Sequence, residues 1–556
     1  MARSPGGWWE LDTPRVRHGV DYEFRVGGDG PFPDPRSAWQ PYGVHGPSRW
    51  LEHGAFVWSD EGWQQPPLGS AVIYELHVGT FTEEGTFEAA IGRLEHLCRL
   101  GVTHVELMPV AEFSGARGWG YDGVDLYAPH HAYGGREGLK RLVNACHERG
   151  LGVLLDVVYN HLGPSGNYLE RFGPYFTDRY STPWGDAVNV DGPGSDEVRR
   201  FLIDNALMWL RDYHFDGLRI DAVHAIADTS ARHFLEQLAD EVDGLVSALA
   251  RHLVLIAESD LNDPRIVRPV AIGGYGIDAQ WNEDFHHALH AALTGEREAY
   301  YADFGTLADL AKTLTRGFAY DGRYSLHRER RHGRPATGLT GHSFVGCLQN
   351  HDQVGNRALG ERTSQLLSEG QLKIGAALVL ASPFVPMLFQ GEEWGASTPF
   401  LYFTDHAEAE LADAVRRGRQ EEFAAFGWRP EEIQDPQAET TFTRSKLAWH
   451  ELEVEPHARL LAWHRALLDL RRRLPSLRDG NLENTSVRFD ETARWLVMRR
   501  GPVSVVCNLS EAAQRVEAPG LEGGEVVLSS DTSSATPTQL EPGALVLAGH
   551  AVAIVR

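Results

Sequence analysis

Cysteine is scarce in this chain. The 556 residues contain four cysteines, Cys98, Cys146, Cys347 and Cys507, and no two of them form a CxxC pair. The first three lie in apolar stretches, which favours buried free thiols over disulfides.

Basic residues are too few to balance the acidic ones. The chain has 52 lysines and arginines against 77 aspartates and glutamates, a formal charge of −25. A polyanion would be repelled, so nucleic acid and anionic membrane are excluded as expected partners. A neutral substrate is not excluded.

Long hydrophobic runs are also missing. Residues 1–9 contain no apolar core of a signal peptide, and no stretch is long enough to span a bilayer. The cytoplasm is the expected location.

The segments that are present predict three domains. Residues 1–66 alternate short strand-like pieces with turns, which indicates a small, apparently incomplete immunoglobulin-like β-sandwich. Residues 67–474 form the expected central domain. Residues 475–556 return to short strands, such as 495–498 and 503–506, and predict a C-terminal antiparallel β domain.

The middle domain repeats a strand, a loop and a helix, which predicts an α/β fold of the (β/α)₈ TIM-barrel type. Helices are expected at 87–100, 139–148, 196–213 and 457–473. Two insertions, 162–194 and 391–455, are long enough to be functional loops. Strands are expected at 72–78, 102–108 and 153–159, before Asp221 and Glu258, near 279–281, before Asp352, and at 385–390.

Three acidic residues, Asp221, Glu258 and Asp352, each follow one of these apolar runs. A lone aspartate at a strand end is usually a helix cap or an ion-pair partner. Three on one barrel rim, each with a histidine or arginine nearby, favour catalysis. Retaining cleavage of a glycosidic bond needs two carboxylates about 5–5.5 Å apart, which adjacent strands can supply. Arg219 lies on the same strand face as Asp221 and should keep it ionised, whereas Glu258 should have a raised pKa.

Four segments then carry a family resemblance: 156–161 (Asp-Val-Val-Tyr-Asn-His), 217–221 (Gly-Leu-Arg-Ile-Asp), the strand-terminal Glu258, and 350–352 (Asn-His-Asp). They resemble the four signature regions of the α-amylase superfamily, in the same order. The resemblance implies that Asp221 is the nucleophile, Glu258 the acid/base and Asp352 the stabiliser of the transition state.

The same resemblance implies residues that bind the sugar before the scissile bond. Arg219, His161 and His351 would contact this sugar, and Tyr121 would stack on it. Aromatic rings and polar groups near the predicted rim complete the expected substrate-binding set: Trp119, Asp156, His224, Asp260, Trp281, Glu393, Phe400 and Tyr402.

Residues 33–48, 257–265, 390–406 and 445–447 resemble one branch of the superfamily. That branch hydrolyses the α-1,4 bond next to the terminal trehalose of maltooligosyl trehalose and releases trehalose. The resemblance implies an oligosaccharide substrate and a place downstream of the synthase that makes maltooligosyl trehalose. Members of this branch normally carry a complete N-terminal sandwich, which this sequence lacks.

Two other functions stay open. A glucan branching enzyme shares the architecture, although its signatures at the seventh and eighth strands have no equivalent here. A glucan-binding protein with an inactive barrel is the second alternative. His286, His287 and His290 lie on a predicted helix without an HExxH pattern, so no metal and no cofactor is expected.

Overall fold

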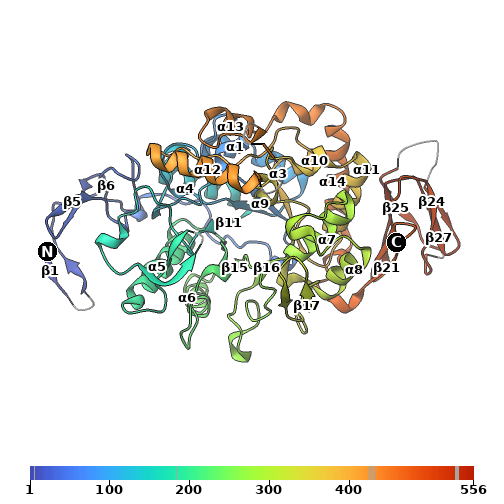
Figure 1. The fold of residues 1–556 in the computed structure, drawn as a ribbon, viewed down its shortest axis with the longest axis horizontal. Coiled ribbons are helices and arrows are strands. Elements are labelled where there is room, and N and C mark those ends of the chain that lie inside the picture. The colour runs from blue at the N-terminus through green and yellow to red at the C-terminus, as the bar shows by residue number, and fades with distance from the viewer. Residues whose placement is uncertain (5–6, 183, 425–427, 430–431, 522, 532–537) are drawn as a thin grey trace.

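Eight parallel strands close into a barrel at the centre of the molecule (Figure 1). The structure is a computed structural model, and it describes all residues except 5–6, 183, 425–427, 430–431, 522 and 532–537. The predicted barrel is confirmed, including its weak sixth strand. Its strands are β7 (Ile73–Leu76), β8 (His104–Leu107), β11 (Gly152–Val157), β14 (Gly217–Ile220), β15 (Val254–Ala257), β16 (Ala279–Trp281), β19 (Phe344–Gly346) and β20 (Val385–Phe389).

Both faces of the barrel strands are buried, which explains their nearly continuous apolar sequences. Side chains such as Ile73, Leu154, Ile256 and Met387 form one cluster, while Tyr74 and other residues of the same strands belong to the larger cluster shared with the helices. The main helices are α2 (Phe87–Ile91), α3 (Leu94–Leu100), α4 (Gly135–His147), α5 (Ser195–Asp212), α6 (Phe234–Leu249), α7 (Glu283–Thr294), α8 (Leu307–Arg316), α11 (Glu369–Leu380) and α14 (His457–Arg473).

The single helix expected at 87–100 is wrong, because the chain forms two helices there. The amides of Gly92 and Arg93 donate to the carbonyls of Ala89 and Ala90, three residues back. These shorter-range bonds tighten and end α2 before α3 starts.

The seventh strand does not extend to Asp352, and that prediction is wrong as well. Strand β19 ends at Gly346, and Asp352 lies in the short helix α9 (His351–Gly355). The Asn350 side chain accepts hydrogen bonds from the amides of Asp352 and Gln353 at 2.9 and 3.3 Å. This cap starts a helix where the sequence pattern suggested a continuing strand.

The insertions contain structure of their own. Residues 162–194 include the hairpin β12 (Phe176–Thr182) and β13 (Gly185–Val188), and residues 391–455 include α12 (Ala409–Ala424) and α13 (Glu439–Arg444). A further hairpin, β17 (Asp321–Ser325) with β18 (Arg330–Gly333), lies between α8 and β19 and was not predicted. Smaller elements are α1 (Val78–Phe81), α10 (Thr363–Leu366), β9 (Ala111–Glu112) and β10 (Asp125–Pro129).

The N-terminal strands lie at one end of the long axis and the C-terminal sheets at the other (Figure 1). The described part of 1–66 forms three two-stranded antiparallel sheets and shows no sandwich, since strands of two to four residues bury too little apolar surface to pack as two layers. These strands are β1 (Ala2–Arg3), β2 (Trp9–Glu10), β3 (Asp21–Tyr22), β4 (Phe24–Val26), β5 (Asp29–Phe32) and β6 (Ser48–Arg49).

The C-terminal antiparallel β domain is confirmed, with a five-stranded and a three-stranded sheet. The domain limits drawn at 66/67 and 474/475 stay predictions.

The four cysteines are free; Cys98 is only partly buried, and the other three are fully buried. No helix among the described residues is long and apolar enough to cross a membrane. The strands of the C-terminal β domain are β21 (Thr485–Asp490), β22 (Trp495–Arg500), β23 (Val503–Asn508), β24 (Gln514–Glu517), β25 (Val526–Ser529), β26 (Gln539–Glu541), β27 (Ala544–Leu547) and β28 (Ala551–Val555).

Arg471 of α14 ties the last barrel helix to the chain around β20. Its side chain is buried, and its guanidinium donates four hydrogen bonds of 2.7–3.2 Å to backbone carbonyls, those of Leu380, Ser382, Phe384 and Leu477. Buried carbonyls without a donor are costly.

We therefore expect Arg471→Leu to lower the free energy of unfolding by about 3 kcal/mol or more, measured by urea denaturation. The neighbouring Arg472→Ala is the control, because this side chain is 78% exposed and only pairs with Asp469. It should cost less than about 1 kcal/mol. Equal effects of the two variants would contradict the structural role of Arg471.

Candidate active site

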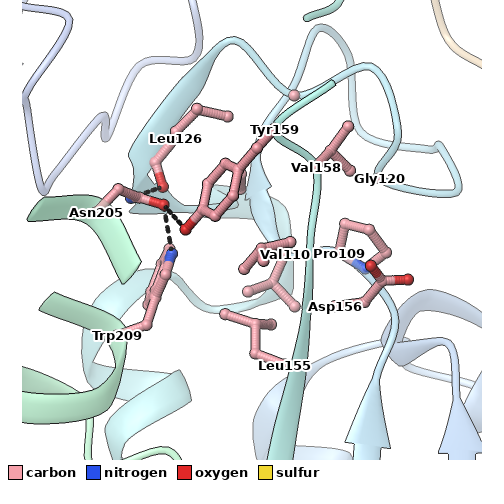
Figure 2. Close-up of a pocket in the computed structure, with 13 residues that line it drawn as sticks. Pro109, Val110, Gly120, Leu126, Leu155, Asp156, Val158, Tyr159, Asn205 and Trp209 are labelled. Atoms are coloured by element: carbon pink, nitrogen blue, oxygen red, sulfur yellow. Dashed lines mark hydrogen bonds between the residues drawn. The ribbon is translucent and has the colours of Figure 1, made fainter. Parts of the chain in front are cut away.

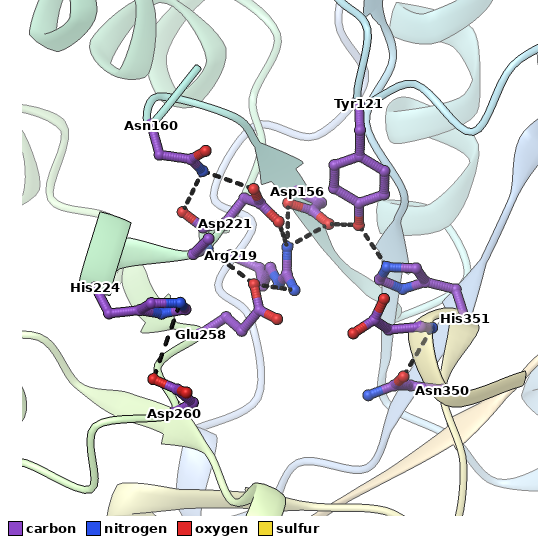
Figure 3. Close-up of polar contacts among 12 residues, drawn as sticks. Tyr121, Asp156, Asn160, Arg219, Asp221, His224, Glu258, Asp260, Asn350 and His351 are labelled. Atoms are coloured by element: carbon purple, nitrogen blue, oxygen red, sulfur yellow. Dashed lines mark hydrogen bonds and ion pairs between the residues drawn. The ribbon is translucent and has the colours of Figure 1, made fainter. Parts of the chain in front are cut away.

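One buried arginine holds three acids together at the carboxyl ends of the strands (Figure 3). Arg219 Nη1 donates to both oxygens of Asp156 at 2.8 and 2.9 Å and to Asp221 Oδ1 at 2.8 Å. Its Nη2 lies 2.9 Å from Glu258 Oε2. Asp156 and Arg219 are direct neighbours in the β11–β14 register, so the barrel itself sets this contact. The predicted contact between Arg219 and Asp221 is confirmed.

Asp221 is held as a carboxylate. Asn160 Nδ2 donates to its Oδ2 at 2.6 Å, while Arg219 occupies Oδ1. Burial by itself would raise the pKa of Asp221, but the charges of Arg219 and His161 and these hydrogen bonds outweigh it, and the pKa is lowered. An ionised carboxylate is what a nucleophile requires.

Glu258 has the opposite character. Its Oε2 accepts a hydrogen bond of 2.8 Å from the amide of Ala222, whose φ of 39° turns the chain sharply after Asp221. Burial raises the pKa of Glu258 well above its ordinary value, and the negative charges of Asp221 and Asp352 add to this effect against the opposing charge of Arg219. The two neighbouring acids therefore have pKa shifts of opposite direction, downward for Asp221 and upward for Glu258, as the sequence predicts for a nucleophile and an acid.

His351 and Tyr121 form a second hydrogen-bonded group. The Tyr121 hydroxyl donates to Asp156 Oδ2 at 2.6 Å and lies 2.8 Å from His351 Nε2. His351 Nδ1 lies 2.5 Å from Glu75 Oε1. Both ring nitrogens thus face acceptors, which fits a charged imidazolium. Burial would lower the pKa of His351, but the Glu75 carboxylate outweighs burial and raises it.

Asp352 lies beside this group. Its Oδ1 accepts a hydrogen bond of 2.6 Å from Nδ2 of Asn356, the residue that follows the end of α9. Its charge contributes to the raised pKa of Glu258. The structure therefore brings all three predicted acids into one electrostatic group.

Two sides of the site can be distinguished in Figure 3. Tyr121 and His351 lie together on one side of Arg219. His224 and Asp260 lie on the other side, next to Glu258, with His224 Nε2 3.9 Å from Asp260 Oδ1.

His161 and Trp184 pack against each other near Tyr121. The rings of His161 and Trp184 are stacked with centroids 4.2 Å apart, and His161 Nε2 lies 3.0 Å from the Tyr121 carbonyl oxygen. Trp184 is half exposed, so part of its side chain is accessible to solvent.

Most of the other predicted aromatic residues are packed behind the site. Trp281 is 4% exposed, and the Arg219 guanidinium carbon lies 4.1 Å from the centre of its ring. Trp119 and Phe400 are stacked and buried, and Trp119 Nε1 donates to the Leu401 carbonyl. Tyr402 packs edge-on against Trp119 and is only half-buried. These rings support the polar residues, and the Arg419 guanidinium carbon lies 4.8 Å from the centre of the Tyr402 ring.

Glu393 is not brought to the site. Its side chain is fully buried, and its carboxylate accepts hydrogen bonds from the Tyr74 hydroxyl and contacts His96 Nε2 at 2.7 Å. Tyr74 belongs to the cluster shared with the helices, so Glu393 lies between the barrel and its outer layer. It stabilises the start of the loop after β20 and cannot contact a substrate.

Sequence reasoning missed Glu75, Asn160 and Asn356. Glu75 is a charged residue inside the apolar strand expected at 72–78, which is itself a signal of function. Asn160 stands within the Asp156–His161 motif, and Asn356 lies one helical turn after Asp352. Each hydrogen-bonds a residue of the site, as described above.

A small pocket next to Asp156 belongs to the scaffold (Figure 2). It lies between β11 and α5, where Asn205 accepts hydrogen bonds from the Tyr159 hydroxyl and Trp209 Nε1 and donates to the Leu126 carbonyl. The polar side chains of Tyr159, Asn205 and Trp209 in this pocket are therefore paired with one another, and Asp156 is paired with Arg219 and Tyr121.

The histidines of α7 do not gather around one point that a metal could occupy. His286 contacts the Tyr301 hydroxyl and His290 contacts Glu296. Within the described ranges, one group of three side chains is close enough to hold an ion: Glu112, His130 and His131. Glu112 already accepts a hydrogen bond from the amide of His131, and its carboxylate lies 2.7 Å from His131 Nδ1. These two contacts compensate the charge of Glu112.

Comparison with known proteins agrees with this geometry. Residues 59–181 match the family model for the alpha amylase catalytic domain, and residues 480–554 match a domain of unknown function, DUF3459. A solved structure of a Salmonella typhimurium protein, described as an alpha amylase, is 40% identical with a TM-score of 0.90, covering 100% of this chain and 93% of that one.

Two named relatives allow the chain to be compared with a trehalohydrolase and with a branching enzyme. A 1,4-alpha-glucan branching enzyme of Corynebacterium jeikeium is 29% identical over 71% of this chain and 56% of its own length. Malto-oligosyltrehalose trehalohydrolase of Arthrobacter ramosus is 54% identical over 92% of this chain and 88% of its own length. The chain therefore belongs to the malto-oligosyltrehalose trehalohydrolase family and is a glycoside hydrolase of the α-amylase type.

Proposed function

We propose that this enzyme hydrolyses the α-1,4-glucosidic bond next to the terminal trehalose of maltooligosyl trehalose, with retention of configuration. The observation that carries the proposal is the pair of acids on adjacent strands β14 and β15. Asp221 is held ionised and Glu258 is held protonated around one guanidinium. This is the pairing of groups that double displacement needs.

In the first step, Asp221 attacks the anomeric carbon of the sugar before the scissile bond. Glu258 transfers its proton to the glycosidic oxygen as the carbon–oxygen bond breaks, and trehalose leaves. In the second step, the Glu258 carboxylate takes a proton from water. The resulting oxygen nucleophile attacks the anomeric carbon and releases Asp221, so both acids return to their starting states.

The remaining residues stabilise positive charge on the sugar ring and fix its orientation. Asp352 supplies a negative charge near the reacting carbon as the oxocarbenium-like transition state forms. Arg219 prevents protonation of Asp221, and His351 and Tyr121 are oriented by Glu75 and Asp156. Their polar groups are suited to bind hydroxyls of the donor sugar.

The chemistry of the substrate also places the reaction in a sequence. A maltooligosyl trehalose must be made by an enzyme that converts the reducing end of a malto-oligosaccharide into a trehalose unit. We propose that this chain acts after such a synthase. The cytoplasm stays the predicted location.

Product analysis tests the proposed substrate. Incubation with maltotriosyl trehalose should release trehalose and maltotriose, whereas maltopentaose should be cleaved at least about tenfold more slowly. A tenfold ratio of the two rates corresponds to a difference of ~1.4 kcal/mol in transition-state binding, which contacts to the terminal disaccharide can supply. Chromatography of both digests gives the answer. Equal cleavage would indicate a general amylase, and new α-1,6 linkages would indicate the branching reaction.

Removal of the nucleophile tests whether the barrel is catalytic. Asp221→Ala should lower kcat on the order of 10⁴-fold or more, because the covalent intermediate can no longer form. Asp240→Ala on α6 is the matched control, since this aspartate is 67% exposed and pairs only with the surface residue Arg232. Unchanged activity of Asp221→Ala would favour a glucan-binding protein.

The pH dependence of kcat/KM should be bell-shaped. Because the pKa of Asp221 is lowered, its carboxylate stays ionised until the pH falls below the ordinary pKa range of aspartate. The acid limb of the profile should therefore lie below that range. Because the pKa of Glu258 is raised, this residue keeps its proton at pH values above the ordinary pKa range of glutamate. Activity should fall at still higher pH, where the proton is lost.

A substrate with a good leaving group provides the control. Glycosylation by α-maltotriosyl fluoride needs no proton from Glu258, so single-turnover measurements of this step should lose the alkaline limb and keep the acid limb. An alkaline limb that persists with the fluoride would assign it to a group other than Glu258.

A further inference from the structure

Glu112, His130 and His131 form a compact group at the base of the loop that carries Tyr121. One nitrogen or oxygen atom from each side chain lies within 4.8 Å of the other two. Glu112 ends β9, and the two histidines follow directly after β10. The antiparallel pairing of β9 with β10 brings the two ends of the loop 113–124 together, so this group exists only in the folded chain.

The imidazole of His130 is fixed in place but lacks hydrogen-bond partners. Its side chain is fully buried, and neither Nδ1 nor Nε2 has a partner among the residues that the structure describes. The His130 amide donates to the Val110 carbonyl at 2.7 Å, and the ring stacks on Phe113 with centroids 3.8 Å apart. Buried polar atoms without a partner are costly, so these nitrogens point to a ligand.

One oxygen of Glu112 faces both histidines. His130 Nδ1 lies 3.3 Å from Glu112 Oε1, and His131 Nδ1 lies 2.7 Å from the same oxygen. The amide of His131 donates to the other oxygen, Oε2, at 2.7 Å. His131 therefore compensates the charge of Glu112 by itself, and this ion pair leaves the nearby nitrogen of His130 unexplained.

We propose that Glu112, His130 and His131 bind a zinc ion. Two imidazoles and a carboxylate are ligands that zinc accepts, whereas magnesium and calcium prefer oxygen ligands alone. With zinc–ligand bonds of about 2.0–2.1 Å in a tetrahedral site, neighbouring ligand atoms lie about 3.3 Å apart, which matches the distance between His130 Nδ1 and Glu112 Oε1.

His131 is the ligand that must adjust. Its Nδ1 has to move about half an ångström away from Glu112 to reach the spacing of zinc ligands. The His131 side chain is 38% exposed, so it has room to move, and solvent on its exposed side supplies the fourth ligand. Zinc takes the place of the proton between His131 and Glu112, and this proton is released to solvent on binding.

The zinc ion has a structural role, because it joins the two ends of the loop 113–124. Tyr133 packs edge-on against His130, and its hydroxyl donates to the Gly118 carbonyl at 3.1 Å. Gly118 lies in the same loop as Tyr121, whose hydroxyl contacts the catalytic group. Bound zinc therefore stabilises the loop from its base, through ligands that are distinct from the catalytic residues.

Zinc binding is tested on the untagged chain with zinc chloride as the probe. After brief dialysis to remove loosely held metal, mass spectrometry of the metal content should find about one zinc per chain, as one site requires. At a zinc concentration about a hundredfold above the Kd, Tm should rise by about 2 °C. Hydrogen exchange of residues 113–124 should slow. Magnesium chloride at the same concentration should change none of these quantities.

Two variants each remove one ligand. His131→Ala changes a partly exposed side chain, so the fold is kept, and Glu112→Gln keeps the size of the buried one. Both should weaken zinc binding at least about tenfold and abolish the slowing of hydrogen exchange. His450→Ala is the matched control, because His450 is exposed and lies outside the group. It should bind zinc like the wild type.

The decisive comparison is between the wild type and His131→Ala, with circular dichroism to show that both are folded. Less than about half an equivalent of zinc in the wild type, or equal zinc affinity in the two proteins, would overturn the inference. None of these measurements uses a glucan. The zinc site and the proposed function can therefore fail independently of each other.

Discussion

The buried guanidinium of Arg219 is the interaction on which the site depends. Burial of a charged group costs several kcal/mol, and it is tolerated only where opposite charges and hydrogen bonds compensate. Asp156, Asp221 and Glu258 supply that compensation, and Trp281 packs against the flat face of the cation. Because the three acids share one cation, their protonation states are linked, and one of them can hold a proton while its neighbour stays ionised.

The barrel makes this arrangement possible. Residues two apart on a strand point to the same face, so Arg219 and Asp221 point together, and the parallel register places Asp156 directly beside Arg219. The network then continues through Tyr121 and His351 to Glu75 on β7. Strands from distant parts of the sequence thus contribute to one connected group, whereas the chemistry on the leaving-group side comes from the loops.

The patterns that predicted the fold were the ones with a strong physical cause. Both faces of a barrel strand are buried, so the strands appear as continuous apolar runs, and even the three-residue strand at Ala279–Trp281 could be recognised. Features set by single hydrogen bonds were missed. The cap at Asn350 turned an expected strand into helix α9, and the tight turn at Gly92 divided an expected helix. The hairpin β17–β18 has a polar, charged sequence with no clear alternation, so its pattern did not reveal it.

The sequence by itself determined the barrel, the identity of the three acids and the reaction class, because the apolar runs and the four signature segments are local and continuous. Only the tertiary structure decided which of the predicted binding residues lie at the candidate site. Glu393 and Phe400 are next to segments shared with trehalose-releasing relatives, yet they are buried between layers, while Arg328 comes from a distant hairpin to meet Asp260. The reason is that orientation and burial depend on contacts between residues far apart in the chain, which no local pattern contains.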